Sequence, residues 1–376
     1  MEDIRPLVDE ADIKNFRDRA LSPERPVTRG TAENPETFFT HREASNSHYD
    51  AIPDVVEHYL GEISKITGRE YHCFSYYGAE DAENIIILMG SATEAAREAI
   101  DYLTSEGKKV GMISVHLYRP FSVKHLFAAV PKTVKKIAVL DRTKEPGAEG
   151  EPLYLDVKSA FYDQENRPVI VGGRYGLGSS DITPAKIISV YNNLELPEPK
   201  NHFTVGIVDD VTFTSLPAVE EMALGGKSIY EAKFFGLGAD GTVGANKNSV
   251  KIIGDNTNKH CQAYFSYDSK KSGGFTCSHL RFGDEPIRST YQITTPNFVA
   301  CHVQAYLNMY DVTRGIRENG SFLLNTIFEG EELVNFIPNK VKRVFAEKNI
   351  TVYYINATKI AQEIGLGNRT NTILQS

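Results

Sequence analysis

The chain has 376 residues, a formal net charge of −8, and an ordinary globular composition of 41% hydrophobic and 24% charged residues. Its length predicts two to three domains, and its acidic balance disfavours a broad nucleic-acid surface, because phosphate backbones bind to a basic face. No apolar run approaches the length of a membrane span and no signal peptide opens the chain, so we expect a cytoplasmic protein that binds neither membrane nor nucleic acid.

The four cysteines give no sign of a metal site. Cys73, Cys261, Cys277 and Cys301 form no C-x-x-C pair, and their spacing fits neither iron–sulfur nor zinc ligation. We expect buried, reduced thiols, as is typical of intracellular proteins. The sequence therefore predicts no metal site in this chain.

Residues 1–70 are polar and interrupted by prolines. Residues 9–21 have apolar side chains at helical spacing and predict one helix, whereas residues 21–41 predict an irregular, extended stretch. Residues 54–67 predict an amphipathic helix. The segment has too few apolar residues for a core of its own, so we expect an irregular N-terminal arm that lies on a larger body.

Residues 71–200 alternate between apolar, strand-like segments and helix-like segments. The expected strands are residues 84–90, 109–117, 135–141 and 168–172. The expected helices are residues 91–104, 122–130, 152–161 and 181–193. Ser91 and Glu94 form a capping box at the first of these helices, and Pro184 lies in the first turn of the last. This alternation predicts a parallel, doubly wound sheet.

A Pro-rich stretch at residues 194–200 marks a boundary, after which a second alternating unit begins. One expected strand ends at Phe235. The other expected strands cover residues 203–208, 260–267, 298–302, 322–328 and 350–355, and a helix is expected around 341–348. The fold class is therefore α/β, with two doubly wound, three-layer α/β/α domains. The expected domains are residues 1–70 as the arm, 71–200 and 201–376.

Residues 370–374 resemble the first turns of a helix, at the very end of the chain. An ending at this point is unusual for a natural terminus. We therefore expect the chain to be an excised part of a longer protein, with its last domain cut short.

The most informative motif covers residues 233–249, where four glycines fall within nine residues between a strand and a helix. Glycines let a backbone approach an anion, and the N–H groups at a helix N-terminus point toward it. Lys247 follows one to two turns into the helix, within reach of a second phosphate. The spacing matches neither the dinucleotide fingerprint nor the P-loop, so a tight turn with positive φ remains the alternative.

A second loop has a similar composition. Residues 264–274 predict a strand that runs into a loop containing Lys270, Lys271, Ser272 and two glycines. Beside a helix N-terminus, such a loop would suit a polyphosphate. Taken alone, it reads equally as a solvated turn. Two such loops in one domain strengthen the interpretation of each.

No arrangement of side chains predicts a catalytic site in this chain. His279 and Arg281 lie in an alternating stretch, where a lone histidine is more often a core or edge residue than a catalyst. No Ser/His/Asp or Cys/His order stands out. We therefore name no catalytic residue.

Several long motifs occur in a fixed order along the chain, and together they resemble the pyruvate:ferredoxin (flavodoxin) oxidoreductase family from end to end. They are Asp141-Arg-Thr-Lys-Glu-Pro-Gly147, Gly173-Arg-Tyr-Gly-Leu-Gly178, Gly236-Leu-Gly-Ala-Asp-Gly-Thr-Val-Gly-Ala-Asn-Lys-Asn-Ser249, Tyr267-Asp-Ser-Lys-Lys-Ser-Gly-Gly274, Ser278-His-Leu-Arg-Phe-Gly283 and Gly365-Leu-Gly-Asn-Arg-Thr370.

The resemblance implies an enzyme that decarboxylates pyruvate on thiamine diphosphate with Mg²⁺, transfers electrons through 4Fe–4S iron–sulfur clusters to ferredoxin or flavodoxin, and forms acetyl-coenzyme A. It also implies a homodimer. This chain resembles an internal portion: the tail of the first domain, the second domain, which is similar to the transketolase C-terminal domain, and most of the third. The thiamine and iron–sulfur sites would lie in the remaining domains, and this part alone would be inactive.

The family's third domain engages coenzyme A, which carries a pyrophosphate and a 3′-phosphate. Clustered N–H donors and lysines suit both groups. The expected contact residues come from the two loops: Gly238, Asp240, Gly241, Thr242, Lys247, Asn248, Lys270, Lys271 and Ser272. The alternative is a scaffolding role, in which these loops pack against other domains and bind no ligand.

Overall fold

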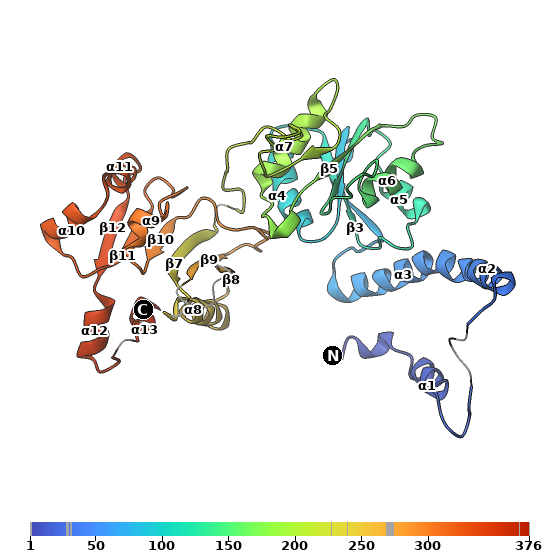
Figure 1. Cartoon of the computed structure of the whole chain (residues 1–376), viewed down its shortest axis with the longest axis horizontal. Coiled ribbons are helices and arrows are strands. Elements are labelled where there is room, and N and C mark those ends of the chain that lie inside the picture. The colour runs from blue at the N-terminus through green and yellow to red at the C-terminus, as the bar shows by residue number, and fades with distance from the viewer. Residues whose placement is uncertain are drawn as a thin grey trace. The chain divides into compact units, whose positions relative to one another are not determined.

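The computed structural model describes residues 2–27, 30, 32–226, 228–238, 240–267, 274–367 and 369–375. These residues form two compact units. The first contains residues 1–90, 109–141 and 145–172, and the second contains residues 91–108, 142–144 and 173–376. The two units are described separately below, and Figure 1 labels their elements.

The first unit begins with helices and continues into a sheet. Its elements are the short 3₁₀ helix Arg5–Leu7, α1 (Glu10–Asp18), α2 (Pro35–Ala44), α3 (Asn46–Thr67), β1 (Phe74–Gly78), β2 (Asn84–Leu88), β3 (Val110–Val115), α5 (Val123–Ala129), β4 (Lys136–Asp141), α6 (Pro152–Ala160) and most of β5 (Val169–Arg174).

The strands of the first unit follow the order β1-β3-β2-β4-β5. β2 pairs in parallel with β3 and β4, whereas the edge strand β1 is antiparallel to β3. The side chains of Ile85, Ile87, Ile113 and Val139 alternate into a core that α5, α6 and the Val56 side of α3 cover. The sheet is therefore mixed.

The N-terminal arm is more helical than its sequence predicts. Residues 21–41 were expected to be irregular, but α2 begins at Pro35, because proline is well suited to the first position of a helix. α3 begins at Asn46 and contains Pro53, eight residues earlier than the expected start at residue 54. Among the described residues of α1, α2 and α3, only Pro53 is buried.

The second unit contains two helices that pack on each other, α4 (Ala92–Ser105) and α7 (Pro184–Glu195), and a sheet with its own helices. The remaining elements are the 3₁₀ helix Leu177–Ser179, β6 (Phe203–Thr204), β7 (Tyr230–Leu237), α8 (Thr242–Asn256), β8 (His260–Tyr267), β9 (Phe275–Gly283), β10 (Phe298–Cys301), α9 (Tyr306–Met309), β11 (Ser321–Asn325), α10 (Gly330–Phe336), α11 (Asn339–Glu347), β12 (Thr351–Ile355), α12 (Ala357–Glu363) and α13 (Asn371–Gln375).

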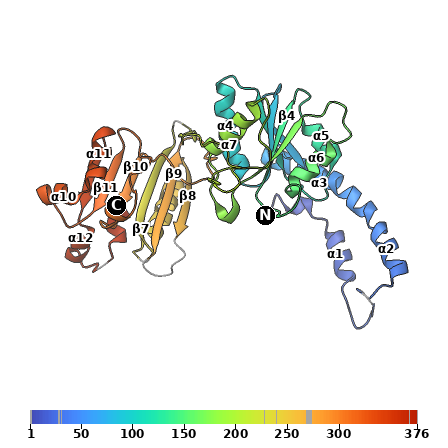
Figure 2. The same cartoon turned by 45° about the horizontal axis from the view of Figure 1, so that its top comes forward.

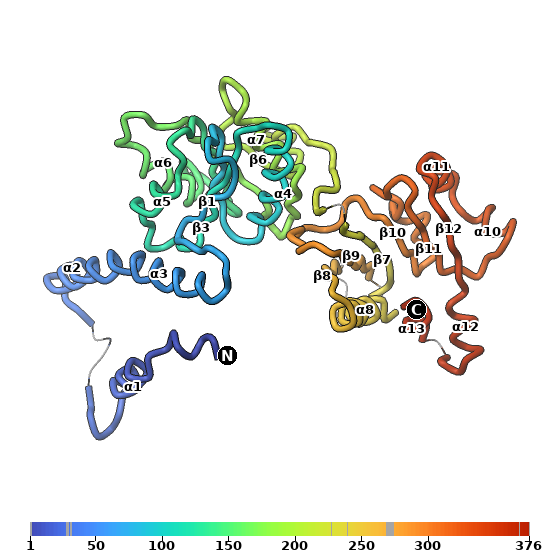
Figure 3. The backbone as a smooth tube through the Cα atoms, turned by 180° about the vertical axis from the view of Figure 1, so that it is seen from behind, coloured from blue at the N-terminus to red at the C-terminus, as the bar shows by residue number. Residues whose placement is uncertain are grey.

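The sheet of the second unit has the strand order β12-β11-β10-β7-β9-β8 (Figure 2). β12, β11, β10 and β7 are parallel, whereas β9 is antiparallel to both β7 and β8. One face carries an apolar core that includes Phe235, Cys277, Cys301 and Phe322. α8 packs against β7, β8 and β9 (Figure 3).

The α/β class predicted from the sequence is confirmed. The strand predicted at residues 260–267 is present as β8, whereas β1, which is antiparallel to β3, and β9, which is antiparallel to β7 and β8, were not predicted as strands. No helix in the described part of the chain combines the length and apolarity that crossing a bilayer requires.

Candidate functional site

The Gly-rich motif forms the turn between β7 and α8. β7 leads through α8 to β8 at one edge of the sheet, whereas β10 leads to β11 on the other side. The carboxyl ends of β7 and β10 therefore form the point at which the direction of winding reverses. Open α/β sheets bind ligands at such a point.

The Asp240 side chain stabilises this turn through hydrogen bonds to the backbone of the turn itself. Its carboxylate accepts hydrogen bonds from the N–H of Leu237 at 2.7 Å and from the N–H of Thr242 at 2.8 Å. A carboxylate that accepts from the first helical N–H stabilises the helix N-terminus. Two donors of the turn are thus already occupied, and a second anion would meet the N–H groups of Val243 and Gly244, which have no acceptor within a helix.

Gly241 needs to be glycine for two reasons. Its φ is +85°, which lies in the left-handed region, and a Cβ atom there would lie 2.9 Å from the Cβ of Asn371 in α13. The close approach of α13 to the turn therefore depends on the missing side chain.

Thr242 and His302 connect the turn to the neighbouring strand. The Thr242 hydroxyl lies 2.7 Å from Nδ1 of His302, which directly follows β10, and both residues are buried. Burial lowers the pKa of His302 to about 4, so the ring is neutral near pH 7. Sequence reasoning did not identify His302, because the partners are 60 positions apart and nothing in the local pattern links them.

The second Gly-containing loop approaches the same turn. The N–H of Gly238 donates a 2.8 Å hydrogen bond to the carbonyl oxygen of Gly274, which directly precedes β9. Lys270, Lys271 and Ser272 themselves lie outside the described residues. The described end of their loop is thus joined to the Gly-rich turn.

The remaining predicted contact residues lie on the exposed side of α8. Lys247 and Asn248 are both exposed, and the ammonium of Lys247 lies 5.4 Å from the centroid of the Phe265 ring on β8. This distance fits a cation–π contact. Lys247 therefore leans toward β8, the strand that leads into the lysine-containing loop.

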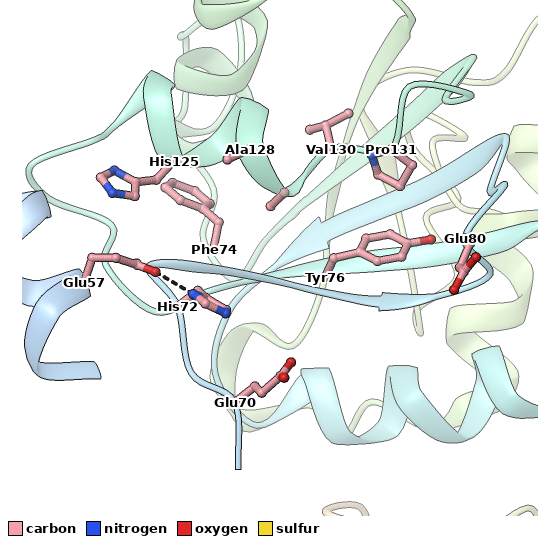
Figure 4. Close-up of a pocket in the computed structure, with 11 residues that line it drawn as sticks. Glu57, Glu70, His72, Phe74, Tyr76, Glu80, His125, Ala128, Val130 and Pro131 are labelled. Atoms are coloured by element: carbon pink, nitrogen blue, oxygen red, sulfur yellow. Dashed lines mark hydrogen bonds and ion pairs between the residues drawn. The ribbon is translucent and has the colours of Figure 1, made fainter. Parts of the chain in front are cut away.

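An open pocket of about 530 Å³ lies in the first unit (Figure 4). Its lining includes Glu57 on α3, His72 just before β1, Phe74 and Tyr76 on β1, and His125 on α5. The carboxylate of Glu57 lies 2.5 Å from Nδ1 of His72 and accepts from the N–H of Cys73. Burial acts to raise the pKa of Glu57, but these hydrogen bonds outweigh it and lower that pKa.

This pocket contains none of the residues that the sequence singled out. The Glu57–His72 pair joins α3 to the start of β1, which is a structural task. No group of three or more His, Cys, Asp or Glu side chains suited to a metal ion occurs within the described ranges. The turn at the switch point is therefore the stronger candidate site.

Comparison with known proteins agrees with the motifs. Residues 231–376 match the family model for pyruvate ferredoxin/flavodoxin oxidoreductase, and residues 82–187 match that for pyruvate:ferredoxin oxidoreductase core domain II. A pyruvate-flavodoxin oxidoreductase from Enterobacter agglomerans is 55% identical over the whole chain, which covers 32% of the relative. A pyruvate:ferredoxin oxidoreductase from Moorella thermoacetica is 51% identical, again over 100% of this chain and 32% of the relative.

Among solved structures, a pyruvate oxidoreductase subunit from Thermotoga maritima is 20% identical, with 40% of this chain and 74% of that chain covered. Its TM-score of 0.31 is too low to assign a fold. The family assignment rests on the sequence matches. The chain belongs to the pyruvate:ferredoxin/flavodoxin oxidoreductase family and spans about a third of the length of the relatives that it matches.

Proposed function

We propose that this chain is part of an enzyme that oxidatively decarboxylates pyruvate to acetyl-coenzyme A and CO₂, and that its second sheet contributes the coenzyme A site. The observation that carries the proposal is the hydrogen bond between Gly238 and Gly274, because it joins the Gly-rich turn to the end of the lysine-containing loop. The names of the two relatives support the reaction.

The chemistry of the two loops suits coenzyme A. The free N–H groups of the first turn of α8 are donors for a phosphate oxygen, and Lys247, Lys270 and Lys271 supply positive charge. Asp240, Gly241 and Thr242 shape the turn. Gly238 brings the two backbones together, and Asn248 and Ser272 add polar groups beside the lysines.

The rest of the enzyme would supply what this chain does not. We propose that thiamine diphosphate, Mg²⁺ and the iron–sulfur clusters bind to its other domains, that ferredoxin or flavodoxin accepts the electrons, and that the whole enzyme is a cytoplasmic homodimer. We also propose domain boundaries near residues 70 and 200.

Calorimetric titration with coenzyme A tests the proposal, with dephospho-coenzyme A as the comparison. We expect saturable binding that weakens when the 3′-phosphate is missing. Lys247→Gln should weaken binding about tenfold, the effect of one lost charge–phosphate contact. Lys340→Gln removes an exposed lysine from α11 in the same unit and is the matched control.

Absence of binding to both the chain and the whole enzyme would contradict the coenzyme A site and favour the scaffolding role. If Lys247→Gln and Lys340→Gln weakened coenzyme A binding equally, the loss would be explained by net charge and not by a contact of Lys247 with the ligand. If Lys247→Gln disrupted assembly of the whole enzyme but left its affinity for coenzyme A unchanged, the scaffolding role would likewise be favoured.

A further inference from the structure

Helix α8 rests on its sheet through small and polar side chains. Its buried residues are Thr242, Ala245 and Asn246, although the helix is 15 residues long. By contrast, the 12-residue helix α7 buries nine residues, Ile187 and Leu194 among them. Because most helix stability in proteins comes from packing an apolar face, this burial holds α8 only weakly on its sheet; α8 also contacts the short helix α13.

The sheet face beneath α8 also carries polar side chains, beside Phe234 and Phe265, which pair with Ser278 on the same face. Thr276 pairs with Gly236 and Ser278 pairs with Phe234 across the β7–β9 ladder. Side chains alternate along a strand, so Thr276 and Ser278 face away from the apolar core that contains Cys277. They lie on the face that α8 covers, and the bond between His302 and Thr242 brings His302 to the same face.

Four polar atoms in this layer are buried without a hydrogen-bond partner in the described part of the chain. They are Oγ1 of Thr276, Oγ of Ser278, Nδ2 of Asn246 and Nε2 of His302. A buried polar group without a partner opposes burial, whereas water satisfies it as soon as the layer opens. These four buried atoms between α8 and the sheet therefore contribute little to the stability of α8 in its packed position.

We propose that α8 opens from the sheet as a local unit, well below the free energy of global unfolding, and that a ligand on its first turn closes it. Opening hydrates the four polar atoms, and Ala245 is the only apolar residue that α8 itself buries within the described ranges, which is the profile of a segment of low local stability. A ligand that binds the closed form stabilises that form by mass action. This second step rests on the proposed coenzyme A site.

Hydrogen–deuterium exchange of the whole chain, read by mass spectrometry, tests the opening. We expect the amides in the middle of α8 to exchange about a hundredfold faster than those of α7. Protection of α8 equal to that of α7 would overturn the proposal.

A pair of substitutions tests the cause. The double variant Thr276→Val with Ser278→Ala removes two unpartnered hydroxyls at nearly constant shape, and we expect α8 to exchange about tenfold more slowly while α7 is unchanged. The control is Thr326→Val, because the buried hydroxyl of Thr326 donates to Gln304 at 2.7 Å. That control should not slow exchange in α8, and faster exchange in the double variant would contradict the polar layer as the cause.

Coenzyme A separates the two steps. Saturating coenzyme A should slow exchange in α8 and leave α7 unchanged. Binding by calorimetry without slower exchange would overturn the closing step alone. Absence of binding would remove the proposed site and the closing step together, whereas the opening is decided by the unliganded chain.

Discussion

The hydroxyl of Thr242 lies 2.7 Å from Nδ1 of His302, which fastens the first residue of α8 to the carboxyl end of β10. The contact crosses the point where the sheet reverses its winding, and it lies directly behind the Gly-rich turn. Both partners are buried, so each depends on the other for this hydrogen bond. The position of the turn is thus set by a pair of side chains as well as by its glycines.

Thr242→Val should destabilise the chain by about 1–3 kcal/mol, because it leaves Nδ1 of His302 buried without its partner. Thr242→Ser keeps the hydroxyl and should cost less. Urea denaturation followed by circular dichroism measures both. Equal stability of the valine and serine variants would show that the hydrogen bond contributes nothing.

Asp240→Ala should cost about 1–2 kcal/mol, as expected for the loss of a capping side chain at a helix N-terminus. Asp240→Asn keeps one carbonyl oxygen and should retain part of the stability. In a titration with coenzyme A, Asp240→Asn should bind at least as tightly as the wild type, since it removes a negative charge beside the proposed phosphate site. Loss of binding in the asparagine variant, with stability kept, would show that the carboxylate contacts the ligand.

A buried ion-pair network lies at the other end of β9. Arg281 is 1% exposed, and its Nε lies 2.7 Å from the carboxylate of Glu231, which also pairs with Arg317. Its Nη1 donates to the carbonyl oxygens of Ser289 and Tyr291, at 3.1 and 2.7 Å, so the guanidinium holds the chain that follows β9.

Arg281→Met should destabilise the chain by about 3–5 kcal/mol, because breaking a buried pair leaves a carboxylate with one partner fewer in a dry environment. Lys259→Met is the control, since Lys259 pairs with Asp284 at an exposed position and should cost less than about 1 kcal/mol. Denaturant midpoints compare the two. A cost for Arg281→Met no larger than that of the control would mean that Glu231 is fully satisfied by Arg317 and water.

Much of this architecture was predictable from hydrophobic periodicity, but the long-range pairs were not. The strand β2 and the helix α6 follow directly from their apolar patterns. The start of α2 at Pro35 was missed because proline was interpreted as a break, although it is well suited to the first turn of a helix.

The candidate site divides in the same way. Clustered glycines and lysines indicate an anion site from local sequence alone, so the turn and Lys247 could be selected from the sequence. The Thr242–His302 contact and the approach of Asn371 to Gly241 depend on how distant segments fold together. Local sequence carries no signal for them.

Acid should destabilise this chain partly through His302. Burial lowers its pKa from the ordinary 6.5 to about 4, and it lowers the pKa of His279, on β9, to about 3. Between pH 6.5 and about 4 the unfolded chain therefore binds more protons than the folded chain. The contribution of His302 is complete above pH 6.5 and is lost as the pH falls toward 4, which amounts to about 3 kcal/mol at most.

His302→Gln should flatten the dependence of the unfolding free energy on pH by close to one proton over this range. His260→Gln, at an exposed position on β8, should leave the slope at its wild-type value. Urea midpoints measured across the same pH range for the three proteins give the comparison. A slope that His302→Gln leaves unchanged would mean that the ring gains its proton over the same pH range in the folded and unfolded chains, and hence is solvated, which would contradict its burial behind the Gly-rich turn.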